Sequence, residues 1–134
     1  MAKYSVLVIE DNLMNQVLVR DILEMDGYEV FLSDNASSGI EMARKHMPSL
    51  ILMDIQLPGM DGLSATRILT NDPELGSIPV VARTSHSMNG DEEKAREAGC
   101  CGYITKPIDV KTFTANLLPY FEGADGAVGG IGSA

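Results

Sequence analysis

The sequence has few cysteines, no long apolar run and no cluster of basic residues, and each absence excludes a class of protein. Its only two cysteines, Cys100 and Cys101, are adjacent, which excludes a disulfide framework and predicts small buried thiols. No apolar run approaches the ~20 residues of a membrane span. The segment MAKYSVLVIED lacks the long apolar core of a signal peptide. We therefore expect a cytoplasmic protein that does not contact a membrane.

The charge balance is strongly acidic. Nineteen Asp and Glu residues against ten Lys and Arg residues give a net charge of −9, and Lys and Arg never form more than a pair. Nucleic-acid binding depends on a basic face that neutralises phosphates, so we do not expect direct binding of nucleic acid. The charge suits a hard cation and a basic or neutral protein partner.

The pattern of apolar residues predicts one α/β domain. Apolar runs alternate five times with helical patterns, which is typical of parallel βαβ units with helices on both faces. We expect a doubly wound, flavodoxin-like five-stranded parallel sheet of order 2-1-3-4-5. The domain is placed at 1–121, followed by a flexible Gly-rich tail at 122–134. The strands are expected at 5–9, 28–32, 50–54, 78–83 and 102–105.

Residues at helical spacing predict which helix faces are buried. In the second helix the expected core stripe is Ala36, Ile40, Ala43 and Met47, and in the fifth it is Val110, Phe113, Leu117 and Phe121. The fourth helix, near 89–98, offers only two alanines to bury, so we expect it to dock weakly. The fifth helix is expected to begin at Asp109 and to end or kink at Pro119.

Polar residues stand where the predicted strands end. In a parallel sheet, ligands bind outside the carboxyl ends of the strands, at the point where the strand order reverses. That point lies between the first and third strands, so their terminal acids should meet. The residues expected in this one crevice are Glu10, Asp11, Asp54, Thr84, Ser85, Tyr103, Lys106 and Pro107.

These motifs resemble the receiver domain of response regulators, the phosphoacceptor half of two-component signalling pairs. The resemblance covers roughly residues 4 to 121, with five motifs in the family's order. The segments ILMDIQLPGMDGL, IPVV, GDEEKAREAGC and YITKPI are most similar to DivK-type stand-alone regulators and to hybrid-kinase receivers.

Three clustered carboxylates would repel one another unless a cation lies between them, and Mg²⁺ favours such oxygen ligands. The resemblance implies that Asp11 and Asp54 ligate Mg²⁺ directly, with Mn²⁺ as a substitute. It adds the backbone carbonyl of Gln56 as a ligand and gives Glu10 a role partly through water.

Asp54 is the expected phosphoacceptor, because a carboxylate at the end of the central strand can attack phosphorus and form an aspartyl phosphate. Lys106 would stabilise the phosphoryl charge, the Thr84 hydroxyl would donate to a phosphoryl oxygen, and Ser85 would leave room beside it. The resemblance implies a cis bond at Pro107, which would aim Lys106 at the pocket.

The resemblance also implies regulation of the phosphorylated state. Gln56 and His86 would flank the path of the water that hydrolyses the acyl phosphate. Thr84 would move inward after phosphorylation and Tyr103 would rotate into the space behind it.

Arg83 departs from the family pattern, which usually has a branched apolar residue before the threonine. A buried, unpaired guanidinium is too costly to keep. Two explanations stay open. Either the head of the side chain reaches the sheet edge, or it pairs with an acid such as Asp91 or Glu92.

We expect a phosphoacceptor that receives its phosphoryl group from a histidine kinase or phosphotransfer protein and contacts a downstream protein through the face formed by the fourth and fifth strands and helices. No turnover of an external substrate is expected. A related phosphatase would need an acid two residues after Asp54, where Gln56 stands.

A pseudo-receiver that binds partners without phosphorylation is a competing hypothesis. A flavin carrier is less compatible with the sequence, because EDNLMNQ places two acids where a phosphate-binding loop needs the amides of Gly, Ser or Thr.

Overall fold

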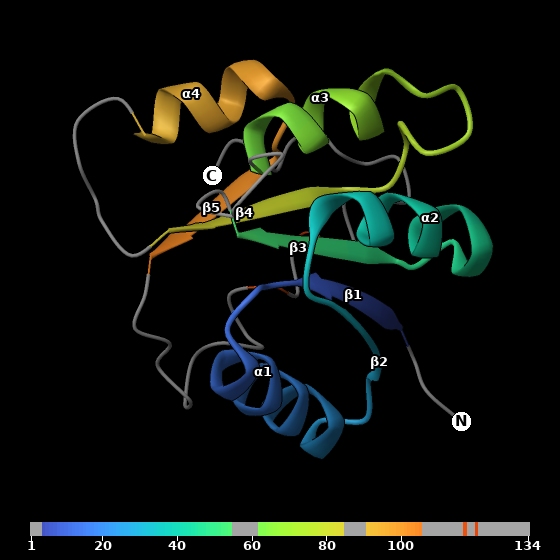
Figure 1. The fold of residues 1–134 in the computed structure, drawn as a ribbon, viewed down its shortest axis with the longest axis vertical. Coiled ribbons are helices and arrows are strands. Elements are labelled where there is room, and N and C mark those ends of the chain that lie inside the picture. Colours follow the sequence, from blue (N-terminus) through green and yellow to red (C-terminus); the bar gives the residue numbers. More distant parts are fainter. Residues whose placement is uncertain (1–3, 55–61, 85–90, 106–116, 118–119, 121–134) are drawn as a thin grey trace.

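The computed structural model describes residues 4–54, 62–84, 91–105, 117 and 120. Strands and helices alternate along the whole described chain (Figure 1). In chain order the elements are β1 (Ser5–Ile9), α1 (Leu13–Met25), β2 (Glu29–Ser33), α2 (Ala36–His46), β3 (Leu50–Asp54), α3 (Gly62–Asn71), β4 (Val80–Thr84), α4 (Asp91–Ala98) and β5 (Gly102–Thr105).

The five strands form one parallel sheet in the order β2-β1-β3-β4-β5, so the predicted fold class and strand order are confirmed. The predicted bounds of β1, β3 and β5 agree with the structure, while β2 begins one residue later and β4 two residues later than expected. Because β1 and β3 are neighbours in the centre of the sheet, the point of reversal lies between them.

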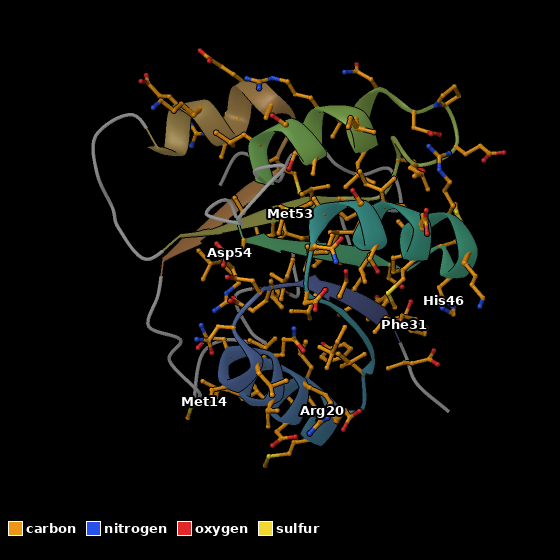
Figure 2. The ribbon with its side chains drawn as sticks, viewed as in Figure 1. Met14, Arg20, Phe31, His46, Met53 and Asp54 are labelled. Atoms are coloured by element: carbon orange, nitrogen blue, oxygen red, sulfur yellow. The ribbon has the colours of Figure 1, made fainter. Side chains whose placement is uncertain are left out.

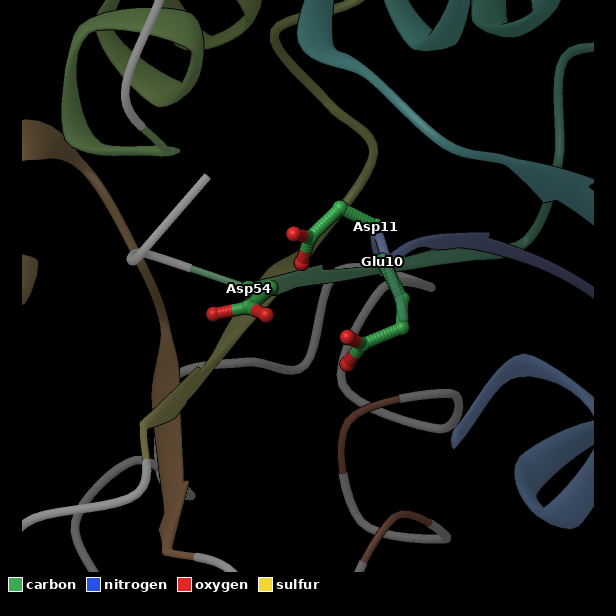
Figure 3. A group of neighbouring side chains, drawn as sticks. All are labelled: Glu10, Asp11 and Asp54. Carbon is green, nitrogen blue, oxygen red and sulfur yellow. The ribbon is translucent and has the colours of Figure 1, made fainter. Parts of the chain in front are cut away.

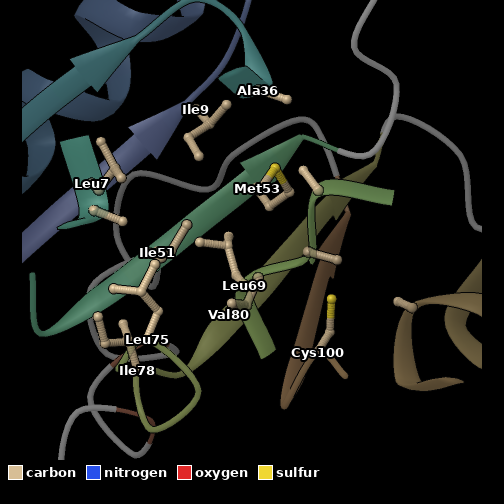
Figure 4. Close-up of a cluster of buried hydrophobic side chains, with 14 residues drawn as sticks. Leu7, Ile9, Ala36, Ile51, Met53, Leu69, Leu75, Ile78, Val80 and Cys100 are labelled. Atoms are coloured by element: carbon tan, nitrogen blue, oxygen red, sulfur yellow. The ribbon is translucent and has the colours of Figure 1, made fainter. Parts of the chain in front are cut away.

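Helices cover both faces of the sheet, with α1 on one side and α2, α3 and α4 on the other (Figure 1). Alternating strand residues supply a separate core to each face. Leu7, Ile9, Ile51 and Met53 belong to the core beneath α2, α3 and α4, drawn in Figure 4. The core beneath α1 contains Val6, Val8, Val19, Leu23, Leu50, Leu52, Val81 and Leu117. β3 is buried along its entire length.

Side-chain caps fix where the first two helices begin. The Asn12 side chain accepts a hydrogen bond from the backbone N–H of Asn15 at 3.0 Å, and Asn35 accepts one from Ser38 at 2.8 Å. These bonds satisfy backbone donors that a helix start leaves unpaired. The cap at Asn12 begins α1 immediately after Asp11, which places the helix next to the strand-end acids.

One member of the predicted core stripe of α2 is wrong. Met47 is 49% exposed and ends the helix in the left-handed conformation, with φ of 46°. The chain therefore turns away from the core one residue after His46, whose ring stacks on Phe31 with centroids 4.1 Å apart (Figure 2). Ala36 and Ala43 are buried, and Ile40 packs against the core, as predicted.

The two cysteines lie in different environments. Cys100 is buried, its thiol lies 3.9 Å from the Thr66 hydroxyl, and burial raises the pKa of this thiol to about 11. Cys101 is exposed, so the prediction of two buried thiols holds for Cys100 only.

The C-terminal predictions are only partly covered by the described residues. α4 buries Ala95 and Ala98, the two alanines expected to face the core. Leu117 is fully buried, while Val110, Phe113, Phe121, Asp109, Pro119 and the tail at 122–134 lie outside the description. Within the residues that the structure places, no helix has the length and apolar character needed to cross a membrane.

Candidate functional site

Three carboxylates meet at the carboxyl ends of the two central strands. β1 and β3 run in parallel with Ile9 opposite Met53, so their next residues, Glu10 and Asp54, follow side by side. Asp11 comes one residue later, before α1 begins. One oxygen from each of the three carboxylates lies within 4.8 Å of the others (Figure 3). The predicted convergence of these three acids is confirmed.

The three carboxylates differ in their exposure. Glu10 and Asp54 are buried at 1% and 2% exposure, whereas Asp11 is exposed and lines a surface pocket together with Gln16, Ser33 and Asp34. In Figure 3 the Asp11 carboxylate lies toward Asp54, and the Glu10 carboxylate lies below Asp11 in this view. Asp11 is therefore the member of this group that solvent reaches most readily.

Arg83 supplies a buried positive charge to this group. Its Nη1 donates to Oε1 of Glu10 at 2.9 Å, and the two side chains are 2% and 1% exposed. The alternative in which the guanidinium reaches the sheet edge is therefore wrong. Pairing with an acid is confirmed, but the partner is Glu10, directly after β1, rather than the two residues of α4 that the sequence suggested.

Glu10 is held by contacts on both carboxylate oxygens. Oε1 accepts from Arg83, and Oε2 accepts from the backbone N–H of Asn12 at 3.1 Å. Its backbone carbonyl also accepts a 2.6 Å hydrogen bond from the side-chain amide of Gln16. Glu10 is thus fixed between β4 and the start of α1, because Arg83 lies on β4 while Asn12 and Gln16 belong to the cap and first turns of α1.

The charge of Arg83 is maintained by its acidic neighbours. Burial lowers the pKa of the guanidinium, and the charges of Glu10 and Asp54 act in the opposite direction. Arginine keeps its proton in proteins because its ordinary pKa lies far above neutral pH. The described part of the pocket therefore holds three carboxyl groups against one guanidinium, an excess of negative groups.

This donor set fits a hard divalent cation. Mg²⁺ is commonly bound by one or two carboxylates with waters completing its shell, and Asp11 and Asp54 offer two carboxylates within reach of one ion. Glu10 adds a third carboxylate nearby, although its contacts with Arg83 and Asn12 already use both of its oxygens.

Several predicted site residues cannot be placed. Gln56, Ser85, His86, Lys106 and Pro107 lie outside the described residues. Thr84 and Tyr103 are described in their backbones only, on the neighbouring strands β4 and β5. The register pairs Ala82 with Tyr103 and Thr84 with Thr105, so positions 84 and 103 fall on the same face of the sheet, two residues apart. The roles of all these residues stay predictions.

The Glu10–Arg83 pair is the feature that sequence reasoning missed. Side chains alternate along a strand, so Glu10 shares a face with Val8, and Arg83 shares one with Val81. Both valines belong to the core beneath α1. The alternation thus placed the two charged residues on one face, and the predicted strand order placed them two strands apart.

Comparison with known proteins identifies the family. Residues 6–118 match the family model of the response regulator receiver domain. The chain is 47% identical over 120 residues to the polar-differentiation response regulator DivK of Brucella anthropi, an alignment that covers 90% of this chain and 98% of that protein. DivK of Brucella ovis is 46% identical with the same coverage.

Solved structures give the same picture. The receiver domain of a sensor histidine kinase from Pseudomonas aeruginosa, crystallised with a magnesium ion in its active-site cleft, superposes with a TM-score of 0.83 at 30% identity, covering 90% of this chain and 99% of that one. The chemotaxis protein CheY4 of Vibrio cholerae gives a TM-score of 0.84 at 21% identity, covering 89% and 99%. The latter likeness concerns the fold alone.

Proposed function

The chain belongs to the response regulator receiver family, and we propose that it accepts a phosphoryl group on Asp54 from a histidine kinase or a histidine phosphotransfer protein. The observation that carries this assignment is the position of Asp54. Its carboxylate ends the central strand and lies within 4.8 Å of the exposed Asp11 carboxylate. Asp11 is not the acceptor in this proposal, because its more open position suits a cation ligand.

The proposed reaction is an in-line transfer. A carboxylate oxygen of Asp54 forms a bond to phosphorus while the bond from phosphorus to the donor's imidazole nitrogen breaks, and the nitrogen keeps the electron pair. Mg²⁺, or Mn²⁺ in its place, would be held by Asp11, Asp54 and the carbonyl of Gln56 and would supply positive charge to the phosphoryl oxygens. Lys106, Thr84 and Ser85 complete the proposed phosphoryl contacts, and Gln56 and His86 are proposed to modulate hydrolysis.

An apolar surface on α1 supports docking of a protein donor. Leu13 and Met14 are 70% and 81% exposed, and Val17 and Leu18 one turn later are also exposed. This patch begins two residues after Asp11, so a protein bound to it would stand beside the pocket. Exposed apolar patches commonly mark such contacts.

Output is proposed to depend on Thr84 and Tyr103, which the strand register places on one face of the sheet. A phosphoryl group brings about −1.5 to −2 charges and new acceptor oxygens. Thr84 would respond to it, and the face formed by β4, β5 and α4 would change its affinity for a downstream protein. The proposed setting is the cytoplasm, without nucleic acid or membrane as a partner and without turnover of an external substrate.

The test is phosphorylation with acetyl phosphate or a phosphorylated phosphotransfer protein, followed by intact-mass and peptide analysis. We expect one phosphoryl adduct, located on Asp54, which is lost in Asp54→Asn and in excess chelator. Asp34→Asn is the matched control, because Asp34 lines the same surface pocket as Asp11 but does not belong to the group of three clustered carboxylates. An adduct that persists in Asp54→Asn would contradict the assignment. Absence of any adduct in the wild type would favour the pseudo-receiver hypothesis.

A further inference from the structure

Arg83 reaches across the centre of the sheet to its partner. The register places Asp54 opposite Arg83 and Ile9 opposite Met53, so Glu10, directly after β1, continues a row with Asp54 on β3 and Arg83 on β4. Neighbouring strands lie about 4.8 Å apart, and β3 stands between the two partners. The Arg83 side chain therefore spans the row in which Asp54 stands, and its charge acts on Asp54 as well as on Glu10.

The position of Arg83 is not that of an ordinary structural ion pair. Its side chain is 2% exposed, and its Nε has no hydrogen-bond partner among the described residues. Burial of a charge with incomplete hydrogen bonding is costly, so the guanidinium is retained against an energetic disadvantage. It lies within the group of carboxylates that would bind the cation, where its charge has a direct effect.

We propose that Arg83 is a resident cation of the acidic pocket, which neutralises Glu10 and thereby sets the pocket's affinity for divalent metal. The Glu10–Arg83 pair carries no net charge, and both Glu10 oxygens already accept hydrogen bonds. Asp11 and Asp54 are then the two carboxylates whose negative charge attracts the ion. The inference rests on the metal site of the proposed function. It assigns Arg83 as a positioning residue whose charge weakens the binding of the metal ion at that site.

The consequence is a definite order of affinities among four proteins. A positive charge close to a divalent cation repels it, so Arg83→Met should bind Mg²⁺ about tenfold more tightly than the wild type. Glu10→Gln leaves the guanidinium unbalanced and should bind about tenfold more weakly. The double variant Glu10→Gln with Arg83→Met replaces a neutral pair by another neutral pair, so its dissociation constant should stay within about threefold of the wild type.

The experiment is a titration of each protein with Mg²⁺ alone, in which binding is measured by calorimetry and by amide NMR shifts. Circular dichroism and thermal melting first establish that each variant is folded. Arg44→Met is the matched control, because it removes the same charge from a pair whose arginine is 47% exposed. Its dissociation constant should equal that of the wild type, which separates an effect of the pocket from an effect of total charge.

Two comparisons test Arg83, one in the wild-type background and one in Glu10→Gln. If Arg83→Met does not fold, the test compares the Mg²⁺ affinity of the double variant with that of Glu10→Gln alone. The double variant avoids the unpaired buried carboxylate of Arg83→Met, because Glu10→Gln has already removed that negative charge. A double variant that binds as weakly as Glu10→Gln overturns the inference, as does a folded Arg83→Met with wild-type affinity. Asp11→Asn tests the site itself: if it binds Mg²⁺ as the wild type does, the proposed metal site fails, independently of Arg83.

Discussion

Two ion pairs of the same chemical type stand in opposite environments in this protein. Arg83 and Glu10 pair at 2.9 Å with both side chains almost fully buried. Arg44 on α2 and Asp72 after α3 pair at 2.7 Å with exposures of 47% and 11%. The shorter pair is the more exposed one, so the distance alone does not rank their contributions to stability.

The difference lies in what each partner loses when the other is removed. Surface ion pairs contribute little, because water and salt screen them and solvate either partner when it is left alone. A buried partner has no such replacement, so breaking a buried pair leaves an uncompensated charge. The exposed pair should therefore tolerate substitution, and the buried pair should tolerate only the removal of both members.

The largest effect is expected from Glu10→Ala. This change leaves the Arg83 guanidinium buried without its acid and also removes the acceptor for the Asn12 N–H. We expect the free energy of unfolding to fall by about 3–5 kcal/mol, measured by urea denaturation at pH 7. A loss below about 1 kcal/mol would show that solvent reaches the guanidinium and that the contrast between the two pairs is false.

Removal of both members sharpens the same contrast. Glu10→Leu combined with Arg83→Met replaces the buried pair by apolar side chains, a change that is often neutral or stabilising in other proteins. We expect the double variant to regain most of the stability lost in Glu10→Leu alone, so that the coupling energy in a double-mutant cycle is on the order of 2–3 kcal/mol. Additive losses from the two single changes would contradict strong coupling between Glu10 and Arg83.

The exposed pair should show the opposite behaviour. Arg44→Ala removes a half-exposed guanidinium from Asp72, and Asp72 still accepts hydrogen bonds from the backbone N–H groups of Glu74 and Leu75. We expect the melting temperature to change by about a degree or less, and 0.5 M NaCl should reduce the change further. A loss comparable with that of Glu10→Ala would show that Asp72 depends on Arg44.

The smallest effect is a pH dependence at Asp72. The backbone hydrogen bond from Glu74 lowers the pKa of this carboxyl, and Arg44 acts in the same direction. Because the pKa of this carboxyl is lower in the folded protein than in the unfolded chain, its ionisation stabilises the fold at pH values above the unfolded-state pKa. This stabilisation is lost as the pH falls through the folded-state pKa. Asp72→Asn should thus melt slightly below the wild type at pH 7 and level with it in acid. A difference that grows toward acid pH would reverse the assigned direction.

The fold and the three clustered acids could be predicted from the sequence, whereas the buried ion pair could not. The strand order, the layers and the meeting of Glu10, Asp11 and Asp54 were predicted, because apolar alternation and the rule on strand ends depend on residues close in the chain. Met47 was placed wrongly because helical spacing was extended to the residue before Pro48, a position that disfavours the α conformation and where α2 in fact ends. The partner of Arg83 was missed because Glu10 lies 73 residues away, after β1, a strand that does not neighbour β4.

The sequence by itself determined which strands neighbour one another and which acids stand at their ends. Local periodicity and the handedness of parallel crossovers restrict such a sheet to a few doubly wound orders, and the resemblance of the motifs to receiver domains indicates the order 2-1-3-4-5. Only the tertiary structure decided which of these acids forms the ion pair with Arg83. That choice depends on how one long side chain packs across β3 in the interior, where the distance to each carboxylate and the exclusion of water determine which pair forms.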